Sequence, residues 1–254
     1  MNYIGIDIGS TAAKVAVRGE NTFNFVLPTG WNSKETTELI KAKLLEWGIK
    51  TKDKDTVVVS TGYGRNSVDF ADYIITEITC HGKGGVFFAN DNCSIIDVGG
   101  QDTKVIIVED GHVVDFLMND KCSAGTGRFL EIMANRLGIT LEELFKLAEA
   151  GDLLPISSLC TVFAESEIIG YIGEGKRRED IACGVIDSVA SKVATLANRK
   201  NLSGDIILTG GLSDNTYFAN ILSEKIGKKV TGIEDGRFAG AIGAAILAEE
   251  KTSH

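Results

Sequence analysis

Two kinds of hydrophobic pattern alternate along the chain, and together they predict an α/β fold with helices covering sheets. Short runs rich in valine and isoleucine predict buried strands, several of which end in a glycine turn. These strands lie within segments 4–19, 56–60, 95–108, 205–215 and 229–233. Longer stretches with apolar residues three and four positions apart predict helices at 33–47, 66–80, 125–137, 140–150, 161–172, 179–199, 216–226 and 239–249. We expect Ser33 to cap the first helix and Gly48 to end it.

Segments 4–15 and 94–105 match each other. IGIDIGSTAAKV lies over SIIDVGGQDTKV, which pairs Asp7 with Asp97, Gly9 with Gly99, Lys14 with Lys104 and Val15 with Val105. Two unrelated hairpins are the alternative, but this match in character and position favours an internal duplication, at an offset too large for a solenoid repeat. We therefore expect two related α/β halves, 1–92 and 93–238, with the closing helix at about 239–254 packed on the first half.

Composition and charge restrict the classes of function. The net charge of −9 argues against binding nucleic acid or an anionic membrane through general electrostatics. No basic and apolar leader opens the chain, and the small-apolar stretch at 238–248 is too short to span a bilayer. The five cysteines are an odd number with no CxxC pair, which makes a disulfide framework improbable. We expect a cytoplasmic protein.

Three glycine turns follow predicted strands: Gly9-Ser10-Thr11, Gly99-Gly100-Gln101-Asp102 and Gly210-Gly211. Glycine lets backbone amides approach an anion closely, so we expect the first two turns to hold phosphates and the third an adenosine group. Neither GxxxxGK[ST] nor a strand-linked GxGxxG occurs, so the P-loop and Rossmann fingerprints are missing. The predicted nucleotide-binding set is Gly9, Ser10, Thr11, Lys14, Gly99, Gly100, Gln101, Asp102, Gly125, Gly127, Gly210 and Gly211.

Acidic residues accompany the first two turns. Asp7 ends the first strand, Asp97 precedes the second turn and Asp102 lies within it. Any one of them alone is a fair candidate for capping a turn. Beside phosphate turns we interpret Asp7 and Asp102 as positioning Mg²⁺, mostly through water, because Mg²⁺ gives up its waters reluctantly. Asp7, Asp102 and Gln101 are the predicted catalytic residues, with Gln101 orienting the attacking water as glutamine does in some NTPases.

Two cysteines precede predicted helices. Cys122 comes shortly before the helix at 125–137, and Cys160 directly before the helix at 161–172. A thiolate at a helix N-terminus lies in positive potential, which favours metal or cluster ligation. Burial in an apolar core is the alternative for both. It is the interpretation we favour for the remaining candidates, Cys80, Cys93 and Cys183, and we assign His81 a structural role as well.

These motifs resemble a known superfamily. IGIDIGSTAAK, IIDVGGQDTK, ILTGGLSDN and FAGAIGAAILA resemble the phosphate-1, phosphate-2, adenosine and connecting motifs of the actin, hexokinase and sugar-kinase superfamily. NDKCSAGTGRFLE, SSLCTVFAESE and TEITCHG narrow the resemblance to ATP-dependent activators of (R)-2-hydroxyacyl-CoA dehydratases and to their relatives. Those relatives are the ATPase subunits of benzoyl-CoA reductase and the reductases of double-cubane-cluster proteins. The resemblance covers nearly the whole chain and implies duplicated ribonuclease-H-like halves with a nucleotide cleft between them.

The resemblance also implies cofactors and partners. It implies ATP or ADP with Mg²⁺, and a homodimer sharing one [4Fe-4S] cluster, held by Cys122 and Cys160 of each chain. An electron from a ferredoxin or flavodoxin would pass to a dehydratase or a double-cubane or benzoyl-CoA reductase-type acceptor. ATP binding would shift the helices that follow the two cysteines. Side chains that could face the partner protein are Arg65, Glu77 and Glu165–Glu167, although solvated surface is the more frequent role of such charges.

Two alternatives belong to other functional classes. The first is a small-molecule kinase of the same superfamily, which needs a carboxylate base beside a polar substrate pocket. The second is a nucleotide sensor or filament subunit without catalytic activity. Iron content separates the activator from both alternatives, and phosphorylation of an added alcohol separates the kinase from the sensor.

Overall fold

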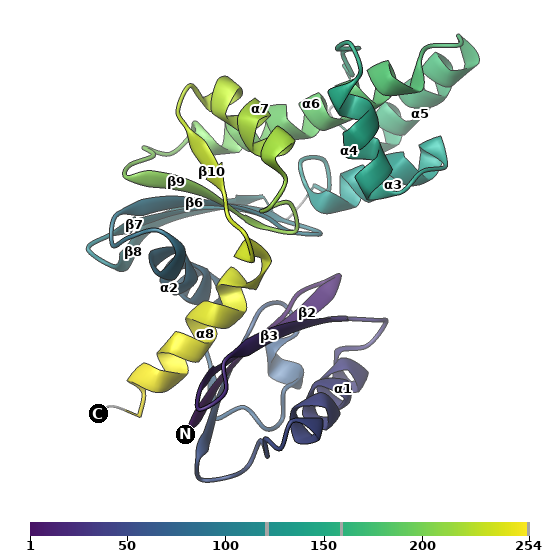
Figure 1. Cartoon of the computed structure of the whole chain (residues 1–254). Helices are drawn as coiled ribbons and strands as arrows, with labels where there is room; N and C mark the ends of the chain where they lie inside the picture. The colour runs from purple at the N-terminus through teal and green to yellow at the C-terminus, as the bar shows by residue number, and fades with distance from the viewer. Residues whose placement is uncertain (120–121, 158–159, 253–254) are drawn as a thin grey trace.

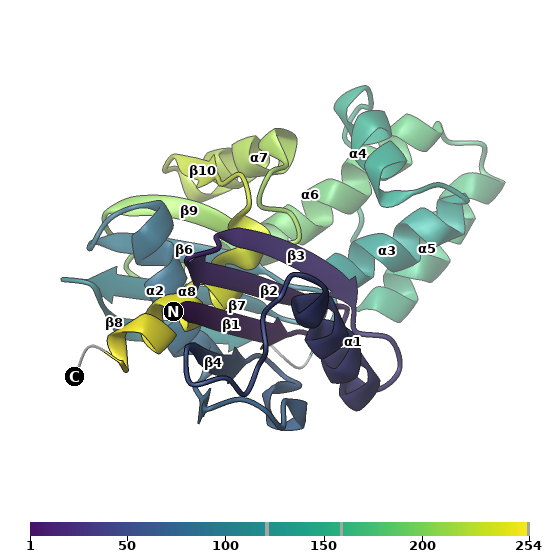
Figure 2. The same cartoon turned by 60° about the horizontal axis from the view of Figure 1, so that its bottom comes forward.

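The protein is described here by a computed structural model covering residues 1–119, 122–157 and 160–252. Within these residues the strands form two five-stranded sheets, which lie one above the other in Figure 1. A helix pair lies between the sheets, and a group of helices extends from one end (Figure 2). The α/β class with two duplicated halves is therefore confirmed.

The first sheet has the order β3-β2-β1-β4-β5. Strands β1, β2 and β3 are antiparallel neighbours, whereas β1, β4 and β5 run parallel. Ile4, Ile6 and Ile8 of β1 are fully buried, so this strand is the centre of the first core. The strands are β1 (Asn2–Ile8), β2 (Ala12–Gly19), β3 (Phe23–Pro28), β4 (Thr56–Thr61) and β5 (Tyr73–Ile74).

The second sheet repeats this arrangement in the order β8-β7-β6-β9-β10. Strands β6, β7 and β8 are antiparallel neighbours, and β6, β9 and β10 run parallel. Asp7 faces Lys14 across β1 and β2, and Asp97 faces Lys104 across β6 and β7, so the matched residues occupy matched registers. The strands are β6 (Cys93–Val98), β7 (Thr103–Glu109), β8 (His112–Asn119), β9 (Asp205–Gly210) and β10 (Val230–Gly232).

Seven predicted helices are found near their predicted positions. They are α1 (Ser33–Glu46), α3 (Gly127–Leu137), α4 (Leu141–Glu149), α5 (Thr161–Gly173), α6 (Arg178–Ala197), α7 (Thr216–Ile226) and α8 (Ala239–Glu250). The prediction that Ser33 caps α1 was wrong. The cap is Asn32, whose side chain accepts hydrogen bonds from the backbone N–H groups of Lys34 and Glu35 at 2.9 and 3.3 Å. Gly48 follows the helix with φ +76°, in agreement with its predicted role as the stop.

The prediction of a helix at 66–80 was also wrong. Residues 65–67 form a short 3₁₀ turn, 73–74 pair with β4, and helix α2 (Glu77–Phe88) begins only after them. Asp72 prevents a continuous helix because its carboxylate accepts a hydrogen bond from the backbone N–H of Val58 at 2.8 Å. This long-range contact outweighs local helical periodicity.

Helices α2 and α8 lie side by side between the two sheets (Figure 1), and glycine makes their contact possible. A Cβ on Gly84 would overlap the carbonyl of Ala239, and one on Gly243 would overlap the carbonyl of Cys80. On its other side α8 packs against β1, where Gly5 meets the carbonyl of Ala241. Within the described residues, no helix has the length and apolar character needed to cross a membrane.

The close packing of α2 and α8 leads to a stability prediction. Gly243→Ala should lower the free energy of unfolding by about 1–3 kcal/mol, because the added methyl overlaps the Cys80 carbonyl. Gly170→Ala is the matched control, since Gly170 also lies inside a helix but has open space around it. That control should be neutral or stabilising by up to about 1 kcal/mol. Urea unfolding measures both, and equal effects would contradict the packing argument.

Candidate functional site

The two predicted phosphate turns have the same local structure and face each other. The N–H of Gly9 donates to the carbonyl of Ala12 at 3.1 Å, and the N–H of Gly99 donates to that of Asp102 at 2.9 Å. A Cβ on Gly100 would overlap the hydroxyl of Thr11, so the turns approach closely enough to require glycine at this position. An anion placed between them would meet backbone amides and hydroxyls from both halves of the chain.

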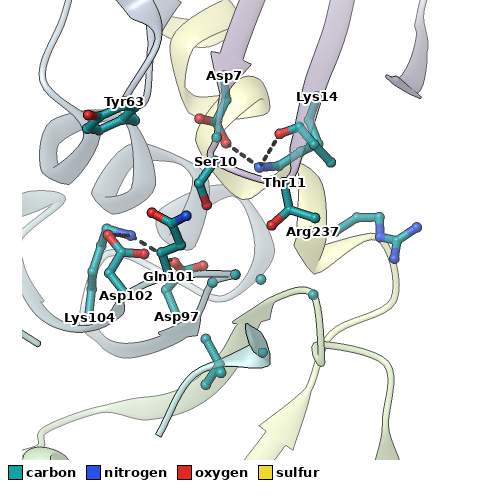
Figure 3. Close-up of a pocket in the computed structure, with 18 of the residues that line it drawn as sticks. Asp7, Ser10, Thr11, Lys14, Tyr63, Asp97, Gln101, Asp102, Lys104 and Arg237 are labelled. Atoms are coloured by element: carbon teal, nitrogen blue, oxygen red, sulfur yellow. Dashed lines mark hydrogen bonds and ion pairs between the residues drawn. The ribbon is translucent and has the colours of Figure 1, made fainter. Parts of the chain in front are cut away.

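A cavity of about 450 Å³ opens at these turns (Figure 3). It brings together most of the predicted nucleotide-binding set, and the Gly210-Gly211 turn after β9 forms another part of its wall. The predicted residues that line it are Asp7, Gly9, Ser10, Thr11, Lys14, Asp97, Gly99, Gly100, Gln101, Asp102, Gly127, Gly210 and Gly211. Gly125 does not line the cavity. Instead its carbonyl accepts a hydrogen bond from the Thr103 hydroxyl at 2.7 Å, behind the second turn.

Lys104 is the central cation of the second half of the site. Its ammonium lies 2.9 Å from a carboxylate oxygen of Glu77, 2.9 Å from Asp102 and 3.4 Å from Asp97. Only 2% of the side chain is exposed. Burial alone would lower the pKa of Lys104, but the three carboxylates outweigh it and raise this pKa above its usual value. Lys104 therefore remains an ammonium and holds three acids in place.

Glu77 also belongs to this network. It lines the cavity as the first residue of α2 and pairs with Lys104, so it is not the freely solvated surface charge that was the alternative for it. The sequence analysis did not predict this position for Glu77, because it placed residue 77 near the end of a helix at 66–80 and not at the start of α2. Arg65 also lines the cavity, whereas Glu165 pairs with Arg136 away from it.

Asp97 is almost completely buried and has several favourable partners. The Thr209 hydroxyl donates to it at 2.8 Å, and His81 lies 3.4 Å away, consistent with the structural role predicted for that histidine. Burial raises the pKa of Asp97, but His81, Lys104 and Thr209 together lower it well below its ordinary value. Asp97 is thus an ionised structural anchor that joins β6, β7, β9 and α2.

Asp7 is paired more simply. Its Oδ2 lies 3.0 Å from the ammonium of Lys14, whose pKa is raised by Asp7 although burial opposes the shift. The other oxygen, Oδ1, is buried without a hydrogen-bond partner in the described part of the chain. Burying a carboxylate oxygen without a partner costs free energy unless a water or a cation binds it. The position of Oδ1 therefore suits a hydrated Mg²⁺, whose waters donate hydrogen bonds to such an oxygen. Asp102 is a less direct candidate for binding Mg²⁺, because its carboxylate is already paired with Lys104.

Other cavity residues were not predicted from the sequence. Tyr63 follows Gly62, whose φ of +85° turns the chain beside Asp7, and Arg237 precedes α8 (Figure 3). The TGYGR segment carried a turn signal that could have pointed to Tyr63. Val26 could not have been found in this way, because β3 was itself not predicted. The remaining unpredicted lining residues include Met118, Glu131, Leu141 and Leu212.

The second phosphate turn is bonded directly to the segment that carries Cys122. The N–H of Gly127 donates to the carbonyl of Gly99 at 2.9 Å, and the N–H of Arg128 donates to that of Gly100 at 2.9 Å. Both donors lie in the first turn of α3. A displacement of the phosphate turn therefore acts on the N-terminus of α3 without any intervening side chain.

Cys122 and Cys160 are both exposed and lie in segments that contact each other. Ser123 and Thr161, the residues that follow them, share a hydrogen bond of 2.9 Å between their hydroxyls. Cys160 is the N-cap residue of α5, whereas Cys122 lies five residues before α3. Two thiolates suit an iron–sulfur cluster but supply only half of a four-cysteine set. Among the described residues of one chain, no group of three metal-binding side chains occurs. Parts of both cysteine motifs, at 120–121 and 158–159, lie outside the described residues.

The other three cysteines differ from this pair. Cys80 and Cys93 are fully buried, and burial raises the pKa of their thiols to about 12 and about 11. Cys183 is partly buried on α6, 3.9 Å from the Tyr217 hydroxyl, and its pKa is also raised by burial. Such thiols are poor ligands and nucleophiles, in keeping with the structural role predicted for them.

Comparison with known proteins agrees with this site. Residues 4–248 match the BadF/BadG/BcrA/BcrD ATPase family. The (R)-2-hydroxyglutaryl-CoA dehydratase activating ATPase of Acidaminococcus fermentans is 39% identical over 255 residues, covering 98% of each chain. The activator of the 2-hydroxyisocaproyl-CoA dehydratase from Clostridium difficile, solved with bound ADPNP, superposes with a TM-score of 0.90 at 34% identity. That match covers 100% of this chain and 97% of the activator.

A more distant structure shows the fold. The ROK family glucokinase from Streptomyces griseus superposes with a TM-score of 0.60 at 16% identity, covering 98% of this chain and all of the glucokinase. The sugar-kinase type of fold and the activator family suggested by the motifs are both confirmed.

The buried environment of Asp97 leads to a prediction on pH dependence. Because the pKa of folded Asp97 lies below its unfolded value of about 4, its ionised form stabilises the fold above about pH 4. This contribution is lost as the pH falls through the folded pKa. Asp97→Asn should therefore be less stable at pH 7 and lose less further stability on acidification below about pH 4. Urea unfolding over a pH series measures the slope.

Asp115→Asn is the control for that experiment, since Asp115 also pairs with a lysine, Lys200, but is exposed. Its slope should follow the wild type because exposed ion pairs are screened. Identical acid slopes for wild type and Asp97→Asn would contradict the assignment of Asp97 as an ionised anchor.

Proposed function

The chain belongs to the BadF/BadG/BcrA/BcrD ATPase family, and we propose that it is an ATP-hydrolysing activator that passes an electron to a partner enzyme. The acceptor is a 2-hydroxyacyl-CoA dehydratase or a related enzyme of the double-cubane or benzoyl-CoA reductase type, and the donor a ferredoxin or flavodoxin. The observation that carries the proposal is the pair of backbone hydrogen bonds that the start of α3 donates to the Gly99-Gly100 turn. They connect the nucleotide site to a ligand cysteine.

In this proposal ATP lies in the cavity between the two halves. The facing turns at Gly9-Ser10-Thr11 and Gly99-Gly100 hold the phosphates, and the Gly210-Gly211 turn receives the adenosine. Asp7, through its unsatisfied Oδ1, and Asp102 are the residues that would hold hydrated Mg²⁺, which would supply charge neutralisation for the phosphates. Gln101 orients the water that attacks the terminal phosphate.

Cys122 and Cys160 from each of two chains would hold one [4Fe-4S] cluster, which would supply one-electron storage. Their exposure suits ligands shared across a two-fold axis, where two thiolates per chain become four. Next to Cys160, α5 exposes Val162 at 65% and Phe163 at 67%, an apolar surface that a second chain or the acceptor would cover. We place the protein in the cytoplasm, where thiols are kept reduced.

The chain acts as a switch because both ligand segments respond to the phosphate turn. Closure of the halves, which we assign to 1–92 with the closing helix and 93–238, would move the Gly99-Gly100 turn relative to the first turn. The hydrogen bonds at Gly127 and Arg128 carry this movement to α3, and the Ser123–Thr161 bond carries it to α5. Hydrolysis then removes the contacts that hold the closed state, which makes electron transfer directional.

The cavity argues against the small-molecule kinase. A kinase of that type needs a carboxylate free to accept the proton of an alcohol. Here Asp97, Asp102 and Glu77 share Lys104, and Asp7 pairs with Lys14 through Oδ2. The remaining carboxylate of the described lining, Glu131, pairs with Arg128. The related proteins of known role are also named as activators.

Iron analysis tests the electron-transfer function. Anaerobically purified wild type is expected to hold about four iron atoms and four acid-labile sulfides per dimer. Cys122→Ser and Cys160→Ser should each lose this iron while still binding ADP, because both cysteines lie outside the cavity. Cys183→Ser should keep it. Wild type that remains free of iron after anaerobic reconstitution would overturn the proposal.

Gly100→Ala tests the nucleotide site separately. Its methyl would overlap the Thr11 hydroxyl and force the two turns apart, so ADP affinity should fall at least tenfold, or about 1.4 kcal/mol. Calorimetric titration measures this change. Gly211→Ala, which has open space around its added methyl, should leave the unfolding temperature of the nucleotide-free protein unchanged. Unaltered ADP affinity in Gly100→Ala would show that the phosphates do not lie between the turns.

A further inference from the structure

Helix α6 carries a buried amino group that has no obvious role in the fold. The Nζ atom of Lys192 is buried and lacks a hydrogen-bond partner within the described residues. A buried ammonium without a partner is strongly unfavourable, and lysine side chains usually avoid this by extending to solvent. The position of Lys192 therefore points to a negatively charged group that should lie beside it.

The surroundings of Lys192 identify where that group would be. Its aliphatic stem packs against Gly125, where an added Cβ would lie 3.1 Å from Cβ of Lys192. Its Nζ lies 4.9 Å from the centre of the Phe129 ring. Gly125 and Phe129 belong to the segment that runs from Cys122 into α3, and the Ser123–Thr161 hydrogen bond holds the Cys160 segment against it. Lys192 thus lies behind both cysteine segments.

The charges that act on Lys192 are consistent with this placement. Burial lowers the pKa of Lys192, and the thiolates of Cys122 and Cys160 oppose the shift. The aromatic face of Phe129 is a further favourable contact for a cation. In contrast, Lys225 on the neighbouring helix α7 forms an ion pair with Asp187 at 2.6 Å.

We propose that Lys192 is a positioning residue whose ammonium offsets the negative charge of the cluster held by Cys122 and Cys160. This inference rests on the proposed function. A cluster with four thiolates carries net negative charge, and reduction adds one electron from the ferredoxin or flavodoxin without breaking a bond. A fixed cation behind the ligands favours that added charge. A two-fold dimer would place one such lysine on each side of the cluster.

Redox titration of the reconstituted dimer tests the role of Lys192. Lys192→Met keeps the apolar stem but removes the charge, and Lys192→Arg keeps the charge. At a fixed potential near the wild-type midpoint, Lys192→Met should show about a tenfold lower ratio of reduced to oxidised cluster. This corresponds to about 59 mV for one electron. The ratio is measured by electron paramagnetic resonance, and Lys192→Arg should stay close to the wild type.

Lys200→Met is the matched charge control. Its ammonium pairs with Asp115 at 2.7 Å, so removing it changes the net charge equally but away from the cysteines. The expected ratio equals that of the wild type. A midpoint in Lys192→Met that matches Lys200→Met, with iron content preserved, would overturn the role of Lys192 and leave the activator function intact.

Iron content separates the remaining outcomes. If Lys192→Met loses iron whereas Lys192→Arg retains it, the charge is required for holding the cluster, which supports the inference. Equal loss from both variants would mean that the shape of the lysine matters and not its charge, which overturns it. Iron-free wild type would overturn both this inference and the proposed function.

Discussion

The ion-pair network around Lys104 is the constraint on which the site depends. A single buried ammonium holds Asp97 from β6, Asp102 from the phosphate turn and Glu77 from α2. Removing this cation takes a partner from the buried Asp97 and from the partly buried Asp102 and Glu77, which is more costly than losing an exposed ion pair. The turn, the sheet and the helix therefore keep one relative position, and the backbone amides of the turn keep their direction.

The charge balance of the cavity follows from this network. The described lining carries five carboxylates, those of Asp7, Glu77, Asp97, Asp102 and Glu131, against two lysines and two arginines, Lys14, Lys104, Arg65 and Arg237. Both lysines are already paired with carboxylates, which in the proposed function suits a triphosphate that arrives with a divalent cation. The Oδ1 of Asp7 is buried among these acids without a hydrogen-bond partner in the described residues. In the proposed function, backbone amides and hydroxyls would therefore recognise the phosphates, and the acids would select the accompanying ion.

The sequence predicted the parts of the site that depend on local chain geometry. The glycine turns and the acids Asp7, Asp97 and Asp102 could be predicted because they lie at or just after the end of a strand with a clear apolar pattern. Strands β3 and β8 were missed because they lie at sheet edges, where half-exposed residues give no continuous apolar run. The position of Glu77 was not predicted because the hydrogen bond between Asp72 and Val58 is a tertiary contact, and helix α2 begins only after the segment that makes it. Lys192 carries no sequence signal, since only packing shows that its amine is buried.

The two halves differ most in the connection that follows their third strand. In the first half the chain passes from β3 to β4 through the single helix α1, whereas in the second half it passes from β8 to β9 through α3, α4, α5 and α6. Equivalent connections start at the same end of each sheet, beside the phosphate turns. An enlarged connection at that end can therefore touch the nucleotide turn with its first helix and extend outward with the others, as Figure 2 shows. The cysteines lie in this connection, so in the proposed function the hairpin turns would hold the nucleotide and the helices of the longer connection would respond to it.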